Sequence, residues 1–201
     1  MQHEPDERNF VETHQLLTGI VTPRPIAWVT TISANGIVNL APFSFFNVFG
    51  SNPPVVVFSP TLRRDGTKKD TLRNLEATRE FVVHSSVSSL AEAVNLTSKE
   101  LPPDESEVEL AGLHTVPSLK VKPPRIAEAP TAMECRVLQI ITTGRGSMAG
   151  NLVVGEVVLL HAADDVFDES GRVDPKKLQT VARLGGDTWC RTTDLFEQKR
   201  P

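Results

Sequence analysis

The chain has 201 residues, of which 39% are hydrophobic, and its 25 acidic and 21 basic residues give a net charge of -4. This composition is typical of a folded globular chain, and the length predicts a single domain over residues 1–201. The acidic balance argues against a surface that binds nucleic acid or anionic membranes.

Targeting and redox signals are few. No apolar run approaches the roughly 18 residues that a membrane-spanning helix needs, and residues 1–8 are polar rather than a secretory signal. The two cysteines, Cys135 and Cys190, are isolated and match no metal-binding spacing. We therefore expect a cytoplasmic protein with no metal site, no membrane partner and no nucleic-acid partner.

The first third of the chain predicts a helix and a β-hairpin. Residues 10–18 have the pattern of a short amphipathic helix that ends at Gly19. Residues 23–25 read Pro-Arg-Pro and force an extended chain. Residues 26–32 are rich in β-branched side chains, and Asn35-Gly36 then predicts a tight turn into a second strand over residues 37–40.

Residues 39–47 read NLAPFSFFN, which mixes three phenylalanines with amide, hydroxyl and proline residues. Two interpretations are open. The stretch could line a site for a flat, partly apolar ligand, because such sites combine apolar walls with a few convergent polar groups. It could equally be a buried strand whose polar residues satisfy the following turn, and the local residues alone favour this second interpretation.

Residues 55–58 predict a buried strand, and a basic loop follows it at residues 59–71. This loop holds several hydroxyls and four basic side chains, and it ends at a predicted helix whose N-cap is Asp70 or Thr71. Free N–H groups at a helix start, with nearby lysine and arginine, suit a phosphate group. A solvated charged loop is the alternative, and on local evidence it is favoured.

The rest of the chain predicts mainly strands. Residues 81–84 form a strand, residues 89–96 a short helix, and residues 97–122 a polar surface excursion with one helical turn. Two long strands at 131–143 and 152–161 flank a glycine-rich turn. That turn is not a dinucleotide fingerprint, because a strand and not a helix follows it. Residues 174–178 predict a short helix, and residues 181–192 an ordered, docked tail. An antiparallel, barrel-like α+β fold is the expected class.

Several strings, taken together and in order, resemble the flavin reductase-like, FMN-binding split-barrel family. They are TPRPIAWVTT at 22–31, NLAPFSFFN at 39–47, SP at 59–60, KDT with Asn74 at 69–74, GEV with His161 at 155–161, and RLGGD at 183–187. The resemblance spans nearly the whole chain. It implies a mainly β, α+β fold, an antiparallel split β-barrel with a few short flanking helices, and a homodimer that binds FMN near the subunit interface.

The resemblance also implies roles for individual residues. The flavin ring would be lined by Asn39, Ala41, Ser44 and Phe45. The ribityl chain and phosphate would be held by Ser59, Thr61, Lys68 and Lys69. The side chains of Arg183 and Trp189 would approach a flavin, which could be that of the other subunit, and Trp189 stands where relatives often have tyrosine. His161 would be the catalytic candidate, with a purely structural role as its alternative.

The implied activity is that of an NAD(P)H:flavin oxidoreductase, in which NADH or NADPH gives a hydride to FMN and a monooxygenase is a possible partner. An alternative is an FMN-binding protein of the same fold that is a carrier or an oxidoreductase for another substrate. The insertion at 97–122 and Trp189 motivate this alternative. A haem-binding or pyridoxal-phosphate oxidase relative is disfavoured by the strings at 39–47 and 69–71.

Overall fold

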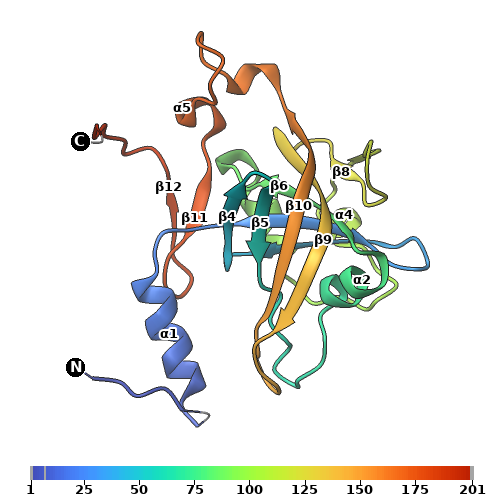
Figure 1. The fold of residues 1–201 in the computed structure, drawn as a ribbon, viewed down its shortest axis with the longest axis vertical. Coiled ribbons are helices and arrows are strands. Elements are labelled where there is room, and N and C mark those ends of the chain that lie inside the picture. The colour runs from blue at the N-terminus through green and yellow to red at the C-terminus, as the bar shows by residue number, and fades with distance from the viewer. Residues whose placement is uncertain (1, 7, 200–201) are drawn as a thin grey trace.

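The computed structural model describes residues 2–6 and 8–199. Its largest feature is one antiparallel sheet, in which every pairing runs between oppositely directed strands. In the order in which they neighbour one another, its seven strands are β3 (Val38–Phe43), β2 (Ala27–Ile32), β6 (Glu80–Ser85), β9 (Thr131–Thr142), β10 (Asn151–Ala162), β5 (Pro54–Phe58) and β4 (Phe46–Ser51). Figure 1 shows these strands wrapped around a common interior.

The sheet is curled because its two outermost strands are consecutive in the chain. β3 and β4 lie at opposite edges, yet only Ser44 and Phe45 separate them. Such a link spans at most about 11 Å, whereas seven flat strands would hold the edges about 29 Å apart. The edges are therefore brought close together, but β3 and β4 do not pair with each other. This arrangement confirms the predicted α+β, mainly β split barrel.

The barrel interior is filled by apolar side chains from the strands and from helix α2 (Asp70–Thr78). Three phenylalanine rings pack along it in tilted pairs. The ring centroids of Phe43 and Phe58 are 5.3 Å apart, and so are those of Phe58 and Phe81. Phe81 packs against the backbone of Gly155, where a β-bulge interrupts the pairing of β10 with β9. Leu75 of α2 is fully buried in the same cluster.

The excursion at 97–122 contains the predicted helical turn, α4 (Glu107–Leu110), but it is not a free surface loop. Its Thr97 accepts a 2.9 Å hydrogen bond from the indole of the buried Trp28. The carboxylate of Glu107 accepts a 2.9 Å bond from the backbone N–H of Leu40 on the edge strand β3. The excursion thus covers an edge that would otherwise expose unpaired backbone groups. The excursion also contains β7 (Thr115–Val116). In the chain it follows η1 (Ser88–Leu90) and α3 (Ala91–Leu96) and precedes β8 (Arg125–Ile126).

Beside the barrel stands a second unit, which we call the arm and define as residues 10–25 and 181–191. It consists of helix α1 (Phe10–Ile20) and a three-stranded sheet made of β1 (Arg24–Pro25), β11 (Val181–Arg183) and β12 (Trp189–Arg191). Figure 1 shows α1 and the β11–β12 hairpin along one side of the barrel, and Val181 of the hairpin packs in one buried cluster with Ile26 and Trp28. The tail is therefore ordered, as predicted. The chain between β10 and the arm carries η2 (Asp164–Val166) and α5 (Pro175–Leu178).

A buried histidine makes the fold sensitive to pH. His84 is fully buried, and its Nε2 accepts a 3.0 Å bond from the Ile126 N–H. Its Nδ1 therefore carries the proton and donates to the Trp28 carbonyl oxygen at 2.9 Å. Burial is the main cause that lowers the pKa of His84 to about 4.

We expect the free energy of unfolding to decrease as the pH falls from about 6.5 to about 4. In this window the unfolded chain binds a proton at His84 that the folded chain does not bind, so acid favours unfolding by up to about 1.4 kcal/mol per pH unit. Urea unfolding at pH 7, 6 and 5 measures the slope. His84→Gln should flatten it, and an unchanged slope in that variant would contradict the assignment.

Candidate functional site

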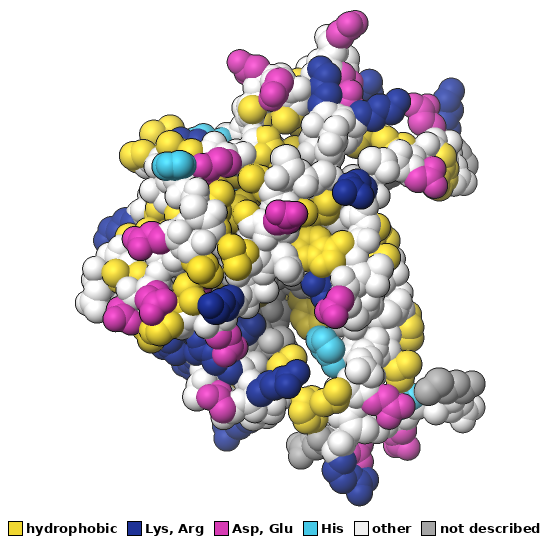
Figure 2. All heavy atoms as spheres, turned by 180° about the vertical axis from the view of Figure 1, so that it is seen from behind, with side chains coloured by type: hydrophobic (Ala, Val, Ile, Leu, Met, Phe, Trp, Pro, Cys, Tyr) yellow, Lys and Arg dark blue, Asp and Glu magenta, His cyan; other side chains and the backbone are white. Residues whose placement is uncertain are grey.

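A cleft of about 230 Å³ lies between the barrel and the arm, and we call it the arm cleft. Figure 2 shows the molecule hollowed between the barrel and α1. The barrel side is lined by Pro42, Phe43, Ser44, Phe45, Ser59, Thr61 and Lys69, and the arm side by His14, Gln15, Thr18, Arg24, Arg183, Leu184 and Gly186. Two further cavities adjoin it through shared residues.

The arm cleft lies where the barrel is open, at the link between its edge strands β3 and β4. Ser44 and Phe45 are the link between the edge strands, so their backbone leaves one edge and enters the other. The carbonyl oxygen of Phe45 accepts a 2.9 Å bond from the N–H of Ser59, which fixes the end of β5 beside the link. In the stretch at 39–47, residues up to Phe43 therefore belong to a strand, and the link that follows them lines a cleft. Strand β4, beginning at Phe46, was not predicted.

The charge of the arm cleft is one-sided. Arg24, Lys69 and Arg183 line it, and none of the described residues in its lining is acidic. Burial, followed by the nearby charge of Arg183, lowers the pKa of Arg24. Burial likewise lowers the pKa of Lys69, an effect that Glu100 opposes and Arg63 reinforces. Cations held together in this way favour an anionic ligand.

Besides lining the cleft, the side chain of Arg24 joins the two halves of the arm. Its guanidinium is buried and donates to the carbonyl oxygens of Thr18 and Val21 at the end of α1. It also donates to the carbonyl oxygen of Leu184 at 3.0 Å, in the turn between β11 and β12. One side chain thus joins the two halves of the arm and faces the cleft.

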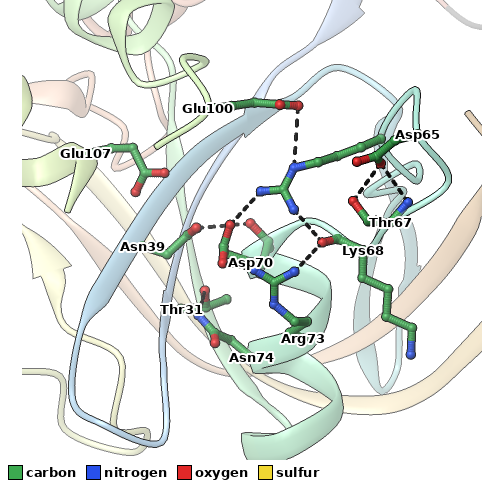
Figure 3. Close-up of polar contacts among 12 residues, drawn as sticks. Thr31, Asn39, Asp65, Thr67, Lys68, Asp70, Arg73, Asn74, Glu100 and Glu107 are labelled. Carbon is green, nitrogen blue, oxygen red and sulfur yellow. Dashed lines mark hydrogen bonds and ion pairs between the residues drawn. The ribbon is translucent and has the colours of Figure 1, made fainter. Parts of the chain in front are cut away.

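Two of the four basic side chains in the loop at 59–71, Arg63 and Lys68, are paired with acids, and Figure 3 shows Asp70, the partner of the first. Arg63 contacts Asp70 at 2.7 Å, and Arg73 contacts the same carboxylate. Lys68 is exposed and pairs with Glu76 at 2.7 Å. Among the described residues, the ammonium of Lys69 has no hydrogen bond or ion pair, and it lies 5.9 Å from the ring centroid of Phe43. Of the two lysines predicted to meet a phosphate, the structure brings only Lys69 to the cleft.

The predicted ring contacts Asn39 and Ala41 line a neighbouring cavity of about 70 Å³, which we call the helix pocket and which also includes Lys69. The Asn39 amide donates a 3.0 Å bond to the hydroxyl of Thr71 and so ties β3 to α2. The predicted N-cap is corrected here. Lys69 is the N-cap of α2, because Asp70 is held by two arginines and Thr71 is held by Asn39.

Trp189 lies at the other side of the arm cleft, in a cavity of about 180 Å³ that we call the tryptophan pocket. Its indole is stacked by Arg183, whose guanidinium carbon lies 5.2 Å from the ring centroid. The register of the β11–β12 hairpin places these two residues directly opposite each other. Ser44 and Arg183 line both this pocket and the arm cleft.

His161 is not among the residues that line these three cavities. Its Nε2 lies 2.7 Å from the fully buried carboxylate of Glu134. The same carboxylate accepts bonds from the N–H groups of Leu119 and Lys120. Burial acts to raise the pKa of Glu134, but these donors and His161 outweigh it and the pKa is lowered. Glu134 therefore anchors the excursion and holds the ring of His161, which the structure does not bring to the cleft.

Among the arm residues that line the cleft, the sequence interpretation assigned a ligand role only to Arg183. His14 stacks near Phe45 with a centroid distance of 5.9 Å, and burial followed by the charge of Arg24 lowers its pKa. A charged residue between two prolines was the only signal for Arg24. No local pattern marked His14 or Thr18.

Two further features concern membrane helices and metal ligands within residues 2–6 and 8–199. None of the helices there has the length and apolar composition to cross a membrane. Within the same part of the chain, no three side chains of histidine, cysteine, aspartate or glutamate are grouped so that they could hold a metal ion.

Several known proteins are similar to this chain in sequence and in fold. An uncharacterized protein of Halalkalibacterium halodurans is 44% identical over 203 residues, which is 100% of this chain and 97% of the relative. The crystal structure of nitrilotriacetate monooxygenase component B from Bacillus cereus is similar, with a TM-score of 0.92, 38% identity and 98% of each chain covered. That of 2-nitrobenzoate 2-nitroreductase NbaA from Pseudomonas fluorescens has a TM-score of 0.86 and 34% identity, covering 99% of this chain and 96% of that one.

The family model described as "Flavin reductase like domain" matches residues 20–178, which include the barrel and the link between its edge strands. The match also includes helix α2 and strand β10, which carries His161. With this match, and with a relative of 44% identity over the whole chain, the protein belongs to the flavin reductase like domain family.

Proposed function

We propose that the protein is an FMN-dependent oxidoreductase that takes reducing equivalents from NADH or NADPH. The observation that carries the proposal is the arm cleft, which combines three cations, no described acid, and an apolar wall at the opening of the barrel. FMN is a planar, amphipathic ring with a phosphate at its far end, and this ligand needs a cleft of that kind.

The residues of the cleft divide into two groups for such a ligand. Lys69, with the hydroxyls of Ser59 and Thr61, would hold the phosphate, since its ammonium has no other partner among the described residues. Ser44 and Phe45 would meet the polar and apolar parts of the ring. When bound, FMN would supply the site that accepts a hydride from the nicotinamide. The protein orients this group and excludes water from it.

We also propose that the working form is a homodimer. Apolar side chains are exposed on the edge strand β4 and on α1, close to the cleft, with Phe49 75% and Ile20 76% accessible. Isolated apolar side chains are common on surfaces, but a group on an edge strand and at one end of α1 suits an interface. Its members are Leu17, Ile20, Val21, Val48 and Phe49.

A second candidate function is an FMN-binding oxidoreductase that acts on a substrate other than free flavin. The tryptophan pocket favours this second candidate, because the pocket is an additional cavity beside the arm cleft. The similar structures include both kinds of protein by name, a monooxygenase component and a nitroreductase. In the first case a monooxygenase would receive the reduced flavin, and in the second the flavin would stay bound. Both would operate in the cytoplasm, where NADH and NADPH are present.

The visible spectrum tests the proposal. Protein loaded with FMN should show flavin absorption that bleaches within seconds when NADH or NADPH is added without oxygen. Rapid bleaching with transfer to added free FMN would support the reductase. Bleaching without transfer would support the second candidate. A protein that fails to bind FMN, or bound FMN that neither nucleotide reduces, would refute the first function.

The phosphate assignment predicts a difference between two adjacent lysines. Lys69→Ala should weaken FMN binding by about tenfold or more but change riboflavin binding little, because only FMN carries the phosphate. Lys68→Ala is the matched control, since Lys68 pairs with Glu76 away from the cleft. Flavin fluorescence titration measures both affinities. Equal effects of the two substitutions on FMN would contradict the assignment.

A further inference from the structure

The tryptophan pocket has the composition of a binding site in its own right. Its walls are apolar where Ile26, Pro42 and Trp189 lie, and its rim carries Ser44, Asn95, Ser98 and Arg183. None of these described lining residues is acidic. The volume of about 180 Å³ is smaller than the 230 Å³ of the arm cleft, so of the two cavities this one suits the smaller ligand, such as a single ring.

Arg183 gives this pocket its charge. Its guanidinium stacks on Trp189, and its side chain makes one hydrogen bond, to the Gly186 carbonyl oxygen. Within residues 2–6 and 8–199 it has no acidic partner within salt-bridge distance. A stacked guanidinium keeps further N–H donors for acceptors near its own plane, where a carboxylate can bind with two parallel bonds. Arg24 differs, because the carbonyl oxygens of the arm already occupy its donors.

The tryptophan pocket lies next to the arm cleft. It shares Pro42, Ser44 and Arg183 with the arm cleft, so a ligand in the pocket and a flavin in the cleft would be neighbours. Arg183 lies over the Trp189 ring, and the indole also lines the pocket, where contact with its apolar surface favours an aromatic ring. A ring on Trp189 would place a substituent beside Arg183.

We propose that the tryptophan pocket binds a planar, single-ring molecule that carries a carboxylate, with the ring against Trp189 and the carboxylate at Arg183. This assignment rests on the proposed function, because it takes the arm cleft as the flavin site. It gives Arg183 and Trp189 to the second ligand rather than to the flavin, and it names arene or heteroarene carboxylates as the ligand class.

Calorimetric titration with benzoate and with its neutral isostere benzamide tests the proposal. Both should bind through the ring, and benzoate should bind about tenfold more tightly, because only its carboxylate makes charge-assisted bonds to Arg183. Arg183→Gln should abolish this preference, and Trp189→Ala should weaken both ligands. Arg191→Gln is the matched control, because Arg191 is exposed on the same hairpin and does not line the pocket.

The titrations are run on FMN-free and on FMN-saturated protein. Benzoate binding that persists with FMN present supports two separate sites, whereas competition between benzoate and FMN would overturn the proposal. Equal affinity for benzoate and benzamide, or a preference that survives Arg183→Gln, would also overturn it. Should FMN itself fail to bind, the proposed function fails, and the benzoate preference of the FMN-free protein still decides the ligand class of the pocket.

Discussion

Replacing Arg24 by methionine should detach the two halves of the arm and destabilise it by about 2–4 kcal/mol. The guanidinium is only 6% exposed and donates to carbonyl oxygens of α1 and of the β11–β12 turn. Methionine has a similar length but no donor, so these oxygens would lose their partner. Each buried acceptor without a partner costs about 1–3 kcal/mol, and water entering the loosened arm would recover part of that cost.

Hydrogen exchange resolves this effect by region. In Arg24→Met, amides of residues 10–25 and 181–191 should exchange faster, while those of the barrel strands keep their protection. FMN affinity should fall in parallel, because the arm forms one wall of the arm cleft. The matched control is Arg191→Met, since Arg191 is exposed on the same arm. Unchanged protection of the arm in Arg24→Met would show that it is held by other contacts.

Gly155→Ala should lower the free energy of unfolding by about 3 kcal/mol, although it adds only one carbon atom. A Cβ at this position would lie 2.3 Å from Cζ and 2.7 Å from Cε1 of Phe81. Phe81 is fully buried and packs on Phe58, so its ring has little room to move. Overpacking of a dense core costs about 1–3 kcal/mol or more, and here the clash falls on a rigid ring. Chemical denaturation measures the loss.

A double-mutant cycle separates this clash from any effect of the backbone. Phe81→Leu alone should destabilise the protein by leaving a cavity. In the double variant, the added Cβ partly fills that cavity, so the combined loss should be smaller than the two single losses together. Additive losses would show that Gly155 is required for its backbone conformation at the bulge rather than for the contact with Phe81.

The sequence predicted the elements whose signals are local. Asn35-Gly36 marked the β2–β3 hairpin, and β9 and β10 followed from long runs of strand-forming residues. Strand β4 was missed because asparagine and glycine interrupt its pattern, and its pairing with β5 only shows in three dimensions. The docking of the excursion at 97–122 likewise depends on bonds between residues more than 60 positions apart.

The residues of the arm cleft were likewise only partly predictable, because some of their contacts join distant parts of the chain. Ser44, Phe45, Ser59, Thr61, Lys69 and Arg183 were predicted together, on a family resemblance, and the fold brings them together. Lys68 and His161 did not join them, because each has an acidic partner elsewhere. The role of Arg24 depends on Leu184, which is 160 residues away, and no pattern within one segment encodes such a pair.

The two-residue link between β3 and β4 also bears on how the chain folds and evolves. Contacts between opposite edges of a sheet usually close long loops, and this slows folding. Here the edges are neighbours even in the unfolded chain, so curling the sheet closes no extra loop. A longer link would cost only about 0.6 kcal/mol per doubling of its length. Ser44 and Phe45 nevertheless line the arm cleft, so a ligand bound there, as proposed, would restrict a segment that folding alone would leave free to vary.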